Sequence, residues 1–409
     1  MTEPHTGSAA AGRQVYLDHA ATTPMFPEAV AAMTDQLTRV GNASSVHASG
    51  RGTRRVVEES RERIAAALGC RPGEVVFTSG GTESDNLAVK GLFWARRAEY
   101  SRRIRILSTA VEHHAVLDPL HWLADREGAG VELLPVDSEC RLDIEALKQS
   151  IERDPDSVAV VSVMWANNEV GTLQPIAEVV DLAHTHKIPV HTDAVQAVGQ
   201  VPVDFARADV DALTLTGHKL GGPFGVGALV VRRELAVTAL QHGGGQERDI
   251  RSGTIDAPAI AGFATAVELS VAQRVEYAAR VAALRDDLVR RVQQVVPSAV
   301  YNGDPVHRLP GNAHLKFPGC EGDSLLMLLD AHGVECSTGS ACSAGVPQPS
   351  HVLLAMGSSD EDARSSLRFS LGHTSTADDV DALVAAIGPA VERATVAGAV
   401  AGLGRAAGA

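Results

Sequence analysis

The sequence has few cysteines and no long apolar run, and each absence argues against a class of protein. Its five cysteines among 409 residues are scattered and include no C-x-x-C pair, which argues against a disulfide scaffold, a zinc ribbon or a thioredoxin-type motif. No apolar stretch approaches the roughly 18 residues that a membrane-spanning helix needs. Residues 1–14 are small and polar, without the apolar core of a signal peptide. We therefore expect a flexible N-terminal tail, reduced thiols and a cytoplasmic location.

Positive charge is also scarce. Lys and Arg number 36 against 50 Asp and Glu, which gives a formal net charge of −14 and argues against a nucleic-acid partner held by general electrostatics. Apolar residues make up 45% and charged residues 21%, which is typical of a globular protein. The length exceeds the roughly 250–300 residues at which a single core stops growing, so the sequence predicts two domains.

From residue 15 to about 270, short β-rich apolar runs alternate with helical patterns. This alternation predicts an α/β domain with a mostly parallel sheet sandwiched between helices. Strands are expected at 74–78, 105–109, 131–135, 158–163, 189–192, 210–215 and 228–231, with helices such as 84–97 and 176–186 between them. Because ligand sites in such sheets gather at the carboxyl ends of the strands, polar residues at those ends are the candidate site residues.

A long helical pattern over about 264–296, ending at Pro297, predicts a bridge into a smaller C-terminal α+β domain at 271–393. Inside this domain we expect helices at 323–332 and 376–391 and a strand at 367–370. Residues 338–350 are small, bear Gly and Pro and have no period, and loops of this kind are usually functional. The Ala/Gly-rich residues 394–409 predict a flexible C-terminal tail.

A lysine and an acid follow two successive predicted strands. Lys219 ends the segment TGHK at 216–219, and Asp193 lies in TDAVQ at 192–196. Alone, Lys219 is more often a solvated loop lysine. Together, the two residues match the needs of pyridoxal phosphate, which takes a lysine for a Schiff base and a carboxylate that keeps its pyridine nitrogen protonated.

Other predicted strand ends carry weaker signals. The segment FTSGGTES at 77–84 runs through two glycines into a helix and predicts an anion-binding turn, although an ordinary helix cap looks the same. His113 could stack on a cofactor ring or move protons, or be satisfied within a loop. Asn168 could bond a ring hydroxyl, or form a turn with Asn167. No G-K-[ST] phosphate loop is present, and no metal site is expected at the histidine pairs.

Taken together, these motifs resemble those of the NifS/IscS-type cysteine desulfurases, within the fold-type I (aminotransferase class V) pyridoxal-phosphate enzymes. The most specific segments are TSGGTESDN (78–86), NNEVG (167–171), TDAVQ (192–196), TGHK (216–219), RSGT (251–254) and TGSAC (338–342). The resemblance implies removal of sulfur from L-cysteine to give L-alanine and a persulfide on Cys342. That sulfur would pass to an acceptor for iron–sulfur cluster assembly or for tRNA or cofactor thiolation.

The resemblance also implies a role for each matching residue. Lys219 would form the Schiff base and move protons with help from His113, and Cys342 would attack the substrate sulfur. The other implied cofactor contacts are Asp193 at the pyridine nitrogen, Asn168 and Gln196 at the ring hydroxyl, and Gly81, Thr82, Thr216, His218 and Thr254 at the phosphate. Thr254 would come from the other subunit of a homodimer. Arg368, with Asn168, would bind the substrate carboxylate, a task that suits a bidentate guanidinium.

The implied partners are L-cysteine and a sulfur-acceptor protein, either an iron–sulfur scaffold or a thiolation enzyme, with no membrane and no direct nucleic acid. Cys342 could ligate an iron–sulfur cluster transiently, but no resident metal is expected. Two alternatives stay open. One is another enzyme of the same fold, such as a selenocysteine lyase or an aminotransferase. The other is a non-catalytic interaction hub, which predicts loss of Lys219, Asp193 or Cys342.

Overall fold

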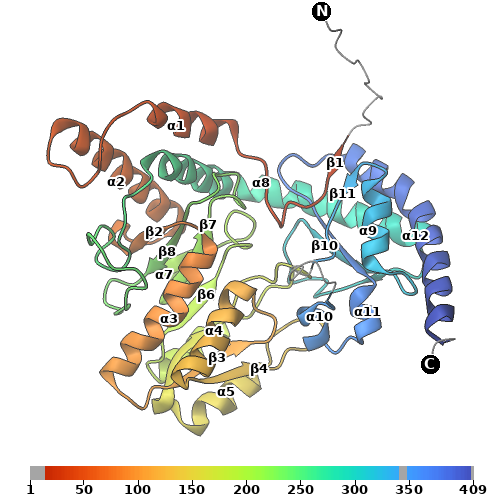
Figure 1. Cartoon of the computed structure of the whole chain (residues 1–409), viewed down its shortest axis with the longest axis horizontal. Helices are drawn as coiled ribbons and strands as arrows, with labels where there is room; N and C mark the ends of the chain where they lie inside the picture. The colour runs from red at the N-terminus through yellow and green to blue at the C-terminus, as the bar shows by residue number, and fades with distance from the viewer. Residues whose placement is uncertain (1–13, 340–347, 407–409) are drawn as a thin grey trace, which may run out of the picture.

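Strands and helices alternate through most of the chain in the computed structural model, which describes residues 14–339 and 348–406, with side chains to 396 (Figure 1). The strands are β1 (Val15–Tyr16), β2 (Val75–Thr78), β3 (Arg105–Thr109), β4 (Gly130–Leu134), β5 (Val158–Ser162), β6 (Val190–Asp193), β7 (Ala212–Thr216), β8 (Gly227–Val231), β9 (Val300–Tyr301), β10 (Asn312–Lys316), β11 (Val334–Glu335) and β12 (Ser366–Ser370). The α-helices are α1 (Pro27–Leu37), α2 (Ala48–Leu68), α3 (Gly81–Glu99), α4 (His114–Glu127), α5 (Ile144–Arg153), α6 (Ile176–Thr185), α7 (Phe205–Ala208), α8 (Ala257–Val295), α9 (Gly322–Asp330), α10 (His351–Ala355), α11 (Asp360–Arg364) and α12 (Ala377–Ala406). Two short 3-10 helices lie at Pro72–Glu74 and Pro155–Ser157.

The central sheet has seven strands in the order β2-β8-β7-β6-β5-β3-β4. Strand β8 runs antiparallel to both of its neighbours, and the other strand pairs are parallel. The predicted mostly parallel sheet is therefore confirmed, and each predicted strand is found with only small shifts at its ends. Strands β5 and β7 are buried throughout, as expected for strands covered on both faces.

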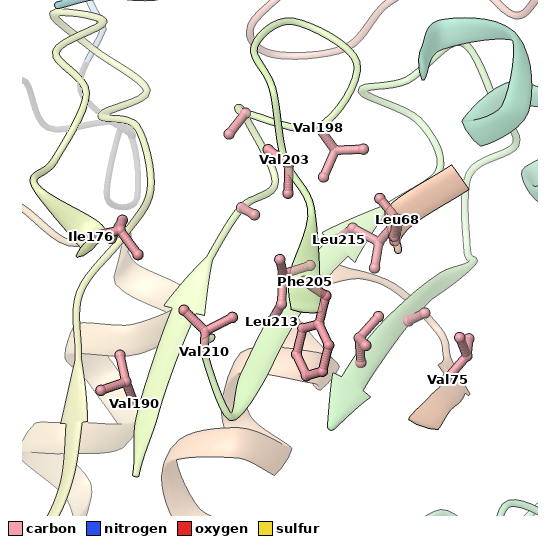
Figure 2. Close-up of a cluster of buried hydrophobic side chains, with 14 of the residues drawn as sticks. Leu68, Val75, Ile176, Val190, Val198, Val203, Phe205, Val210, Leu213 and Leu215 are labelled. Atoms are coloured by element: carbon pink, nitrogen blue, oxygen red, sulfur yellow. The ribbon is translucent and has the colours of Figure 1, made fainter. Parts of the chain in front are cut away.

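Helices cover both faces of this sheet and bury two separate apolar layers. Residues of α3 and α4 pack with the sheet in one layer. The other layer joins the opposite face to α2, α6 and α8. Figure 2 shows part of the second layer, where Leu213 and Leu215 of β7 lie near Phe205 and Val210. Burial of the sheet on both sides fixes the strand ends, where the candidate site lies.

A second, smaller unit forms around the antiparallel sheet β12-β10-β9. Its core includes residues of α9 and α12 and of the C-terminal half of α8. Helix α8 spans both units in Figure 1, contacting α1 and α2 toward one end and α12 toward the other. The predicted domain boundary at 271 falls inside this helix, and the division into domains stays a prediction. The short β1–β11 pair joins the N-terminal segment to the smaller unit.

Some elements differ from the sequence predictions. Helix α8 begins seven residues early at Ala257, because Asp256 caps it by accepting a bond from the Ala259 amide at 3.0 Å, with a proline in the first turn. Helix α12 continues to Ala406, past the tail expected from 394, because its alanines are strong helix formers. Strand β10 was not predicted. Its residues Asn312 and His314 are polar yet buried, which hid the strand pattern.

No helix in the part of the chain that the structure describes is long and apolar enough to cross a membrane.

Truncation of Leu213, which is fully buried in β7, should weaken the fold. We expect Leu213→Ala to lower the free energy of unfolding by about 3 kcal/mol, from lost apolar transfer plus an unfilled cavity. The control Val275→Ala removes a side chain that is 74% exposed on α8 and should change it by less than about 0.5 kcal/mol. Urea denaturation followed by circular dichroism measures both. Equal losses in the two variants would contradict the assignment of Leu213 to the core.

Candidate active site

One cavity of about 220 Å³ lies at the carboxyl ends of the parallel strands. Its walls come from the segments that follow β2, β3, β5, β6 and β7, and from the N-terminal segment. The lining residues are Ala21, Gly81, Thr82, Asp85, His113, Ala115, Met164, Ala166, Asn168, Asp193, Val195, Gln196, Thr216, His218 and Lys219. Every residue predicted to contact a cofactor is in this set except Thr254. The sheet thus brings together side chains that are far apart in the sequence.

Lys219 carries the only amine among the residues that line this cavity. It follows β7 and is partly buried. The pKa of the amine is lowered to about 8, chiefly by desolvation and also by the charge of the nearby Arg368 guanidinium. The carboxylates of Asp193, Asp18 and Asp85 act in the opposite direction. An amine with this pKa is neutral in a substantial fraction of molecules near neutral pH, as a nucleophile or a base must be.

Asp193 is the last residue of β6 and is buried. One carboxylate oxygen, Oδ1, accepts a hydrogen bond from the Val195 amide at 2.8 Å, which fixes the orientation of the carboxyl group. Burial raises the pKa of Asp193, and this bond and the charge of Lys219 oppose the rise. The carboxyl group can therefore receive a hydrogen bond from a protonated nitrogen placed in the cavity.

His113 caps the N-terminus of α4 and faces the same cavity. Its Nδ1 accepts a hydrogen bond from the Ala115 amide at 3.0 Å. Burial, together with the charge of Lys219, lowers the pKa of His113 to about 4. The ring is therefore neutral near pH 7, and because Nδ1 acts as an acceptor, the proton resides on Nε2.

An anion-binding turn forms where β2 leads into α3. Gly80 has φ of 153°, a backbone conformation that side chains disfavour, and a Cβ on Gly81 would lie 3.0 Å from Val195. The first-turn amides of α3, which include Gly81 and Thr82, have no partners inside the helix and carry its positive dipole end. The close approach and the free amides suit a phosphate group.

His218 and Thr216 border this turn from the β7 side. The His218 Nδ1 lies 3.3 Å from the Thr22 hydroxyl, and its ring stacks on Phe224 at a centroid distance of 5.5 Å. Burial lowers the pKa of His218 to about 4, with a contribution from Lys219. Gln196 donates from Nε2 to the Ala20 carbonyl at 2.9 Å, which leaves its carbonyl oxygen for the cavity.

Arg368 lies beside the cavity but does not line it. It projects from β12, donates from Nη1 to the Asn168 carbonyl at 3.0 Å, and forms an ion pair between Nη2 and Asp18 Oδ1 at 2.7 Å. Thr254 is exposed and does not line the cavity in the single chain. Cys342 lies outside the described residues. The nearest described residue on its N-terminal side is Gly339.

Two acidic residues of the site were not predicted from the sequence. Asp85 lines the cavity, one helical turn after Gly81, and its Oδ1 lies 3.6 Å from His191 Nε2. The i,i+4 spacing on α3 was the signal that could have found it. Glu112 is fully buried next to His113, and its Oε1 accepts bonds from the Thr109 hydroxyl and the Met164 amide, both at 2.9 Å. Nothing in the local pattern distinguishes Glu112 from a surface acid.

Comparison with known proteins agrees with this geometry. The sequence profile of the family described as Aminotransferase class-V matches residues 15–383. The chain belongs to this family, among its NifS/IscS-type cysteine desulfurases. An IscS-like cysteine desulfurase of Mycobacterium tuberculosis is 56% identical over 381 residues, or 93% of this chain and 96% of that protein.

Two solved structures share the fold. A NifS-like protein superposes with a TM-score of 0.86 at 33% identity, covering 93% of this chain and all of its own. The protein SspA, solved in complex with cysteine, superposes with a TM-score of 0.74 at 31% identity, covering 88% of this chain and 99% of its own. The predicted α/β architecture of fold-type I enzymes is therefore confirmed.

Glu112 makes the stability of this desulfurase depend on pH. Burial raises the pKa of Glu112 from 4.5 to about 8 in the folded chain. Between these pH values the folded state holds a proton that the unfolded chain releases, so this group lowers stability as pH rises. We expect Glu112→Gln, which has the shape of the protonated acid, to flatten the decline of the thermal midpoint from pH 5 to pH 8.

Thermal unfolding at a series of pH values measures this effect. Glu139→Gln, at an exposed position, is the control and should keep the wild-type slope. A Glu112→Gln variant with an unchanged slope would show that the Glu112 carboxyl is not protonated in the folded protein.

Proposed function

We propose that this chain removes sulfur from L-cysteine with pyridoxal phosphate, leaving L-alanine and a persulfide on Cys342. The observation that carries the proposal is the pairing of an amine of lowered pKa, Lys219, with the Asp193 carboxyl in one cavity. The family membership and the cysteine bound to the related SspA structure support the choice of substrate. A non-catalytic hub has no need of this arrangement.

The residues of the cavity fit pyridoxal phosphate. Lys219 supplies the amine for its aldehyde, and Asp193 supplies an acceptor for its protonated pyridine nitrogen. The α3 turn at Gly81 and Thr82 suits the phosphate, with Thr216 and His218 beside it. Asn168 and Gln196 can bond the ring hydroxyl, and His113 can lie against the ring. When bound, this cofactor supplies an electron-accepting ring joined to the substrate amine.

The chain itself supplies proton transfer and orientation. The Lys219 amine, with a pKa of about 8, can take the proton from the substrate Cα and later return a proton to the product. His113, neutral and protonated at Nε2, can donate a hydrogen bond toward the reacting atoms. Arg368 would bind the substrate carboxylate and thereby orient the substrate Cα for proton transfer.

Cys342 accepts the sulfur. Its thiolate attacks the substrate sulfur, so that an S–S bond forms while the carbon–sulfur bond breaks. The electron pair of the broken bond stays with the substrate carbon, which becomes the methyl group of alanine after protonation. Sulfur is oxidised to the persulfide level and carbon is reduced, so no external oxidant or reductant is required. An acceptor protein then takes the outer sulfur, for iron–sulfur cluster assembly or for thiolation.

We also propose that the working form is a homodimer. Thr254 is exposed and lies outside the cavity of its own chain, as expected of a residue that completes the phosphate site of a second copy. Phe224 is exposed and stacks on His218 of the cavity, and that copy would cover it.

Replacement of Lys219 tests the cofactor assignment. We expect Lys219→Ala to lose the visible absorbance of the bound cofactor and to form no protein adduct on borohydride reduction. Alanine release from L-cysteine should fall about a thousandfold or more, because both the covalent anchor and the base are removed. The control Lys148→Ala, at an exposed position on α5, should behave as wild type. A reducible adduct that persists in Lys219→Ala would refute the assignment.

Replacement of Cys342 tests the sulfur-transfer assignment. Cys342→Ser should keep the cofactor absorbance but form no persulfide and release no alanine, since its hydroxyl cannot accept sulfur. The matched control Cys70→Ser changes a thiol that lies between α2 and the first 3-10 helix and should keep full activity. Persulfide labelling and amino-acid analysis after addition of L-cysteine give both readouts. A Cys342→Ser enzyme that forms persulfide at the normal rate would disprove the role of Cys342.

A further inference from the structure

Arg368 is already paired with a carboxylate of its own chain. Its side chain is 5% exposed, and its Nη2 lies 2.7 Å from Asp18 Oδ1. Nη1 donates to the Asn168 carbonyl at 3.0 Å. Nε is buried and has no hydrogen-bond partner among the described residues. The Arg368 guanidinium, to which we assign the substrate carboxylate, is thus already paired with Asp18.

The shape of the guanidinium group makes this pairing significant. It is a planar fork that can bind a carboxylate by two parallel bonds along either of two edges. One edge consists of Nη1 and Nη2, and the other of Nε and Nη2. Both edges include Nη2, the nitrogen that Asp18 already holds. A second carboxylate bound bidentately to Arg368 would therefore share that nitrogen with Asp18.

Two carboxylates on one nitrogen repel each other. We propose that Asp18 competes with the substrate carboxylate for Arg368 and thereby sets both the affinity for L-cysteine and the requirement for its carboxylate. This inference rests on the proposed function, because it takes Arg368 as the anchor of the substrate. Asp18 is here a positioning residue, which acts on the substrate through Arg368.

The attachment of Asp18 suits a carboxylate that can leave. Its backbone is fixed, because its carbonyl accepts bonds from the Tyr16 hydroxyl at 3.1 Å and the Ala21 amide at 3.0 Å, and it forms a bridge to Ser370. Its side chain, by contrast, is 21% exposed and is bonded to Arg368. Rotation about its side-chain bonds can therefore move the carboxylate into water without disturbing the backbone.

The exchange also avoids an unpaired buried charge. An arginine that waited for substrate without a partner would bear the full cost of burying its charge, which destabilises proteins strongly. Here Asp18 neutralises Arg368 until the substrate carboxylate replaces it. A thiol or amine without a carboxylate gives nothing that can displace Asp18, so the same pair favours α-amino acids over simpler thiols.

Binding measurements on the holoenzyme test this inference. The probes are 3-mercaptopropionate, which has a thiol and a carboxylate but no amine to react with the cofactor, and its neutral amide. We expect Asp18→Asn to lower the dissociation constant of 3-mercaptopropionate about three- to tenfold, because a repelling charge near the site is removed. Affinity for the amide should not change, and the KM for L-cysteine should fall. Isothermal titration calorimetry and steady-state kinetics give these values.

Matched variants separate competition from a structural effect. Asp381→Asn removes a carboxylate from an arginine pair far from the cavity, on α12, and should leave every value unchanged. Asp18→Glu keeps the charge and should stay within about twofold of wild type. Asp18→Ser removes the same charge with a different side chain and should tighten binding as Asp18→Asn does, which covers a failure of Asp18→Asn to fold.

The outcomes distinguish this inference from the proposed function. Unchanged or weaker binding of 3-mercaptopropionate in the folded Asp18 variants, or equal tightening of the amide, overturns the competition. If Arg368→Gln abolishes carboxylate binding at the same time, the proposed function stands without it. If Arg368→Gln leaves carboxylate binding intact, the role of Arg368 in the proposed function fails and the competition fails with it. Tighter binding of 3-mercaptopropionate in the Asp18 variants, with loss of its binding in Arg368→Gln, supports both the competition and the proposed function.

Discussion

The site depends on one amine placed among fixed charges at the end of a buried strand. Lys219 must be neutral often enough to react, and its charged form must also be tolerated in a protein interior that disfavours charge. Desolvation and the charge of Arg368 lower the pKa of its amine, and the carboxylates of Asp193, Asp18 and Asp85 raise it. The resulting pKa is about 8. Each of these groups comes from a different element. The reactivity of one nitrogen is therefore a property of the whole arrangement of the fold.

The topology of the sheet produces this arrangement directly. Parallel strands point their carboxyl ends to one edge, so residues that follow β2, β3, β5, β6 and β7 meet without any long loop. The two apolar layers hold the strand ends in place. The smaller sheet then brings Arg368 against Asn168, so that the group beside the reacting amine comes from a unit that folds around a different core.

Much of this could be predicted from the sequence, for identifiable reasons. The strands of the large sheet are buried on both faces, so their residues form near-continuous apolar runs that a local pattern reveals. Lys219 and Asp193 follow such runs directly, and topology alone then places them together. Asp18 and Arg368 could not be paired in this way, because they are 350 residues apart and no local pattern joins them. Strand β10 could not be predicted either. Its buried face is polar where it meets the large unit, so the strand lacks the apolar pattern that a sequence reading depends on.

Helix α8 is one continuous helix that packs on both units. Its 39 residues span about 58 Å at 1.5 Å per residue, with one end packed on α1 and α2 and the other beneath the smaller sheet. Over that length a tilt of about 2° would displace the far end by about 2 Å, enough to make or break a hydrogen bond. The packing of α8 on α1 and α2 therefore helps to set the position of the smaller unit that carries Arg368. One continuous helix thus joins the packing of both units.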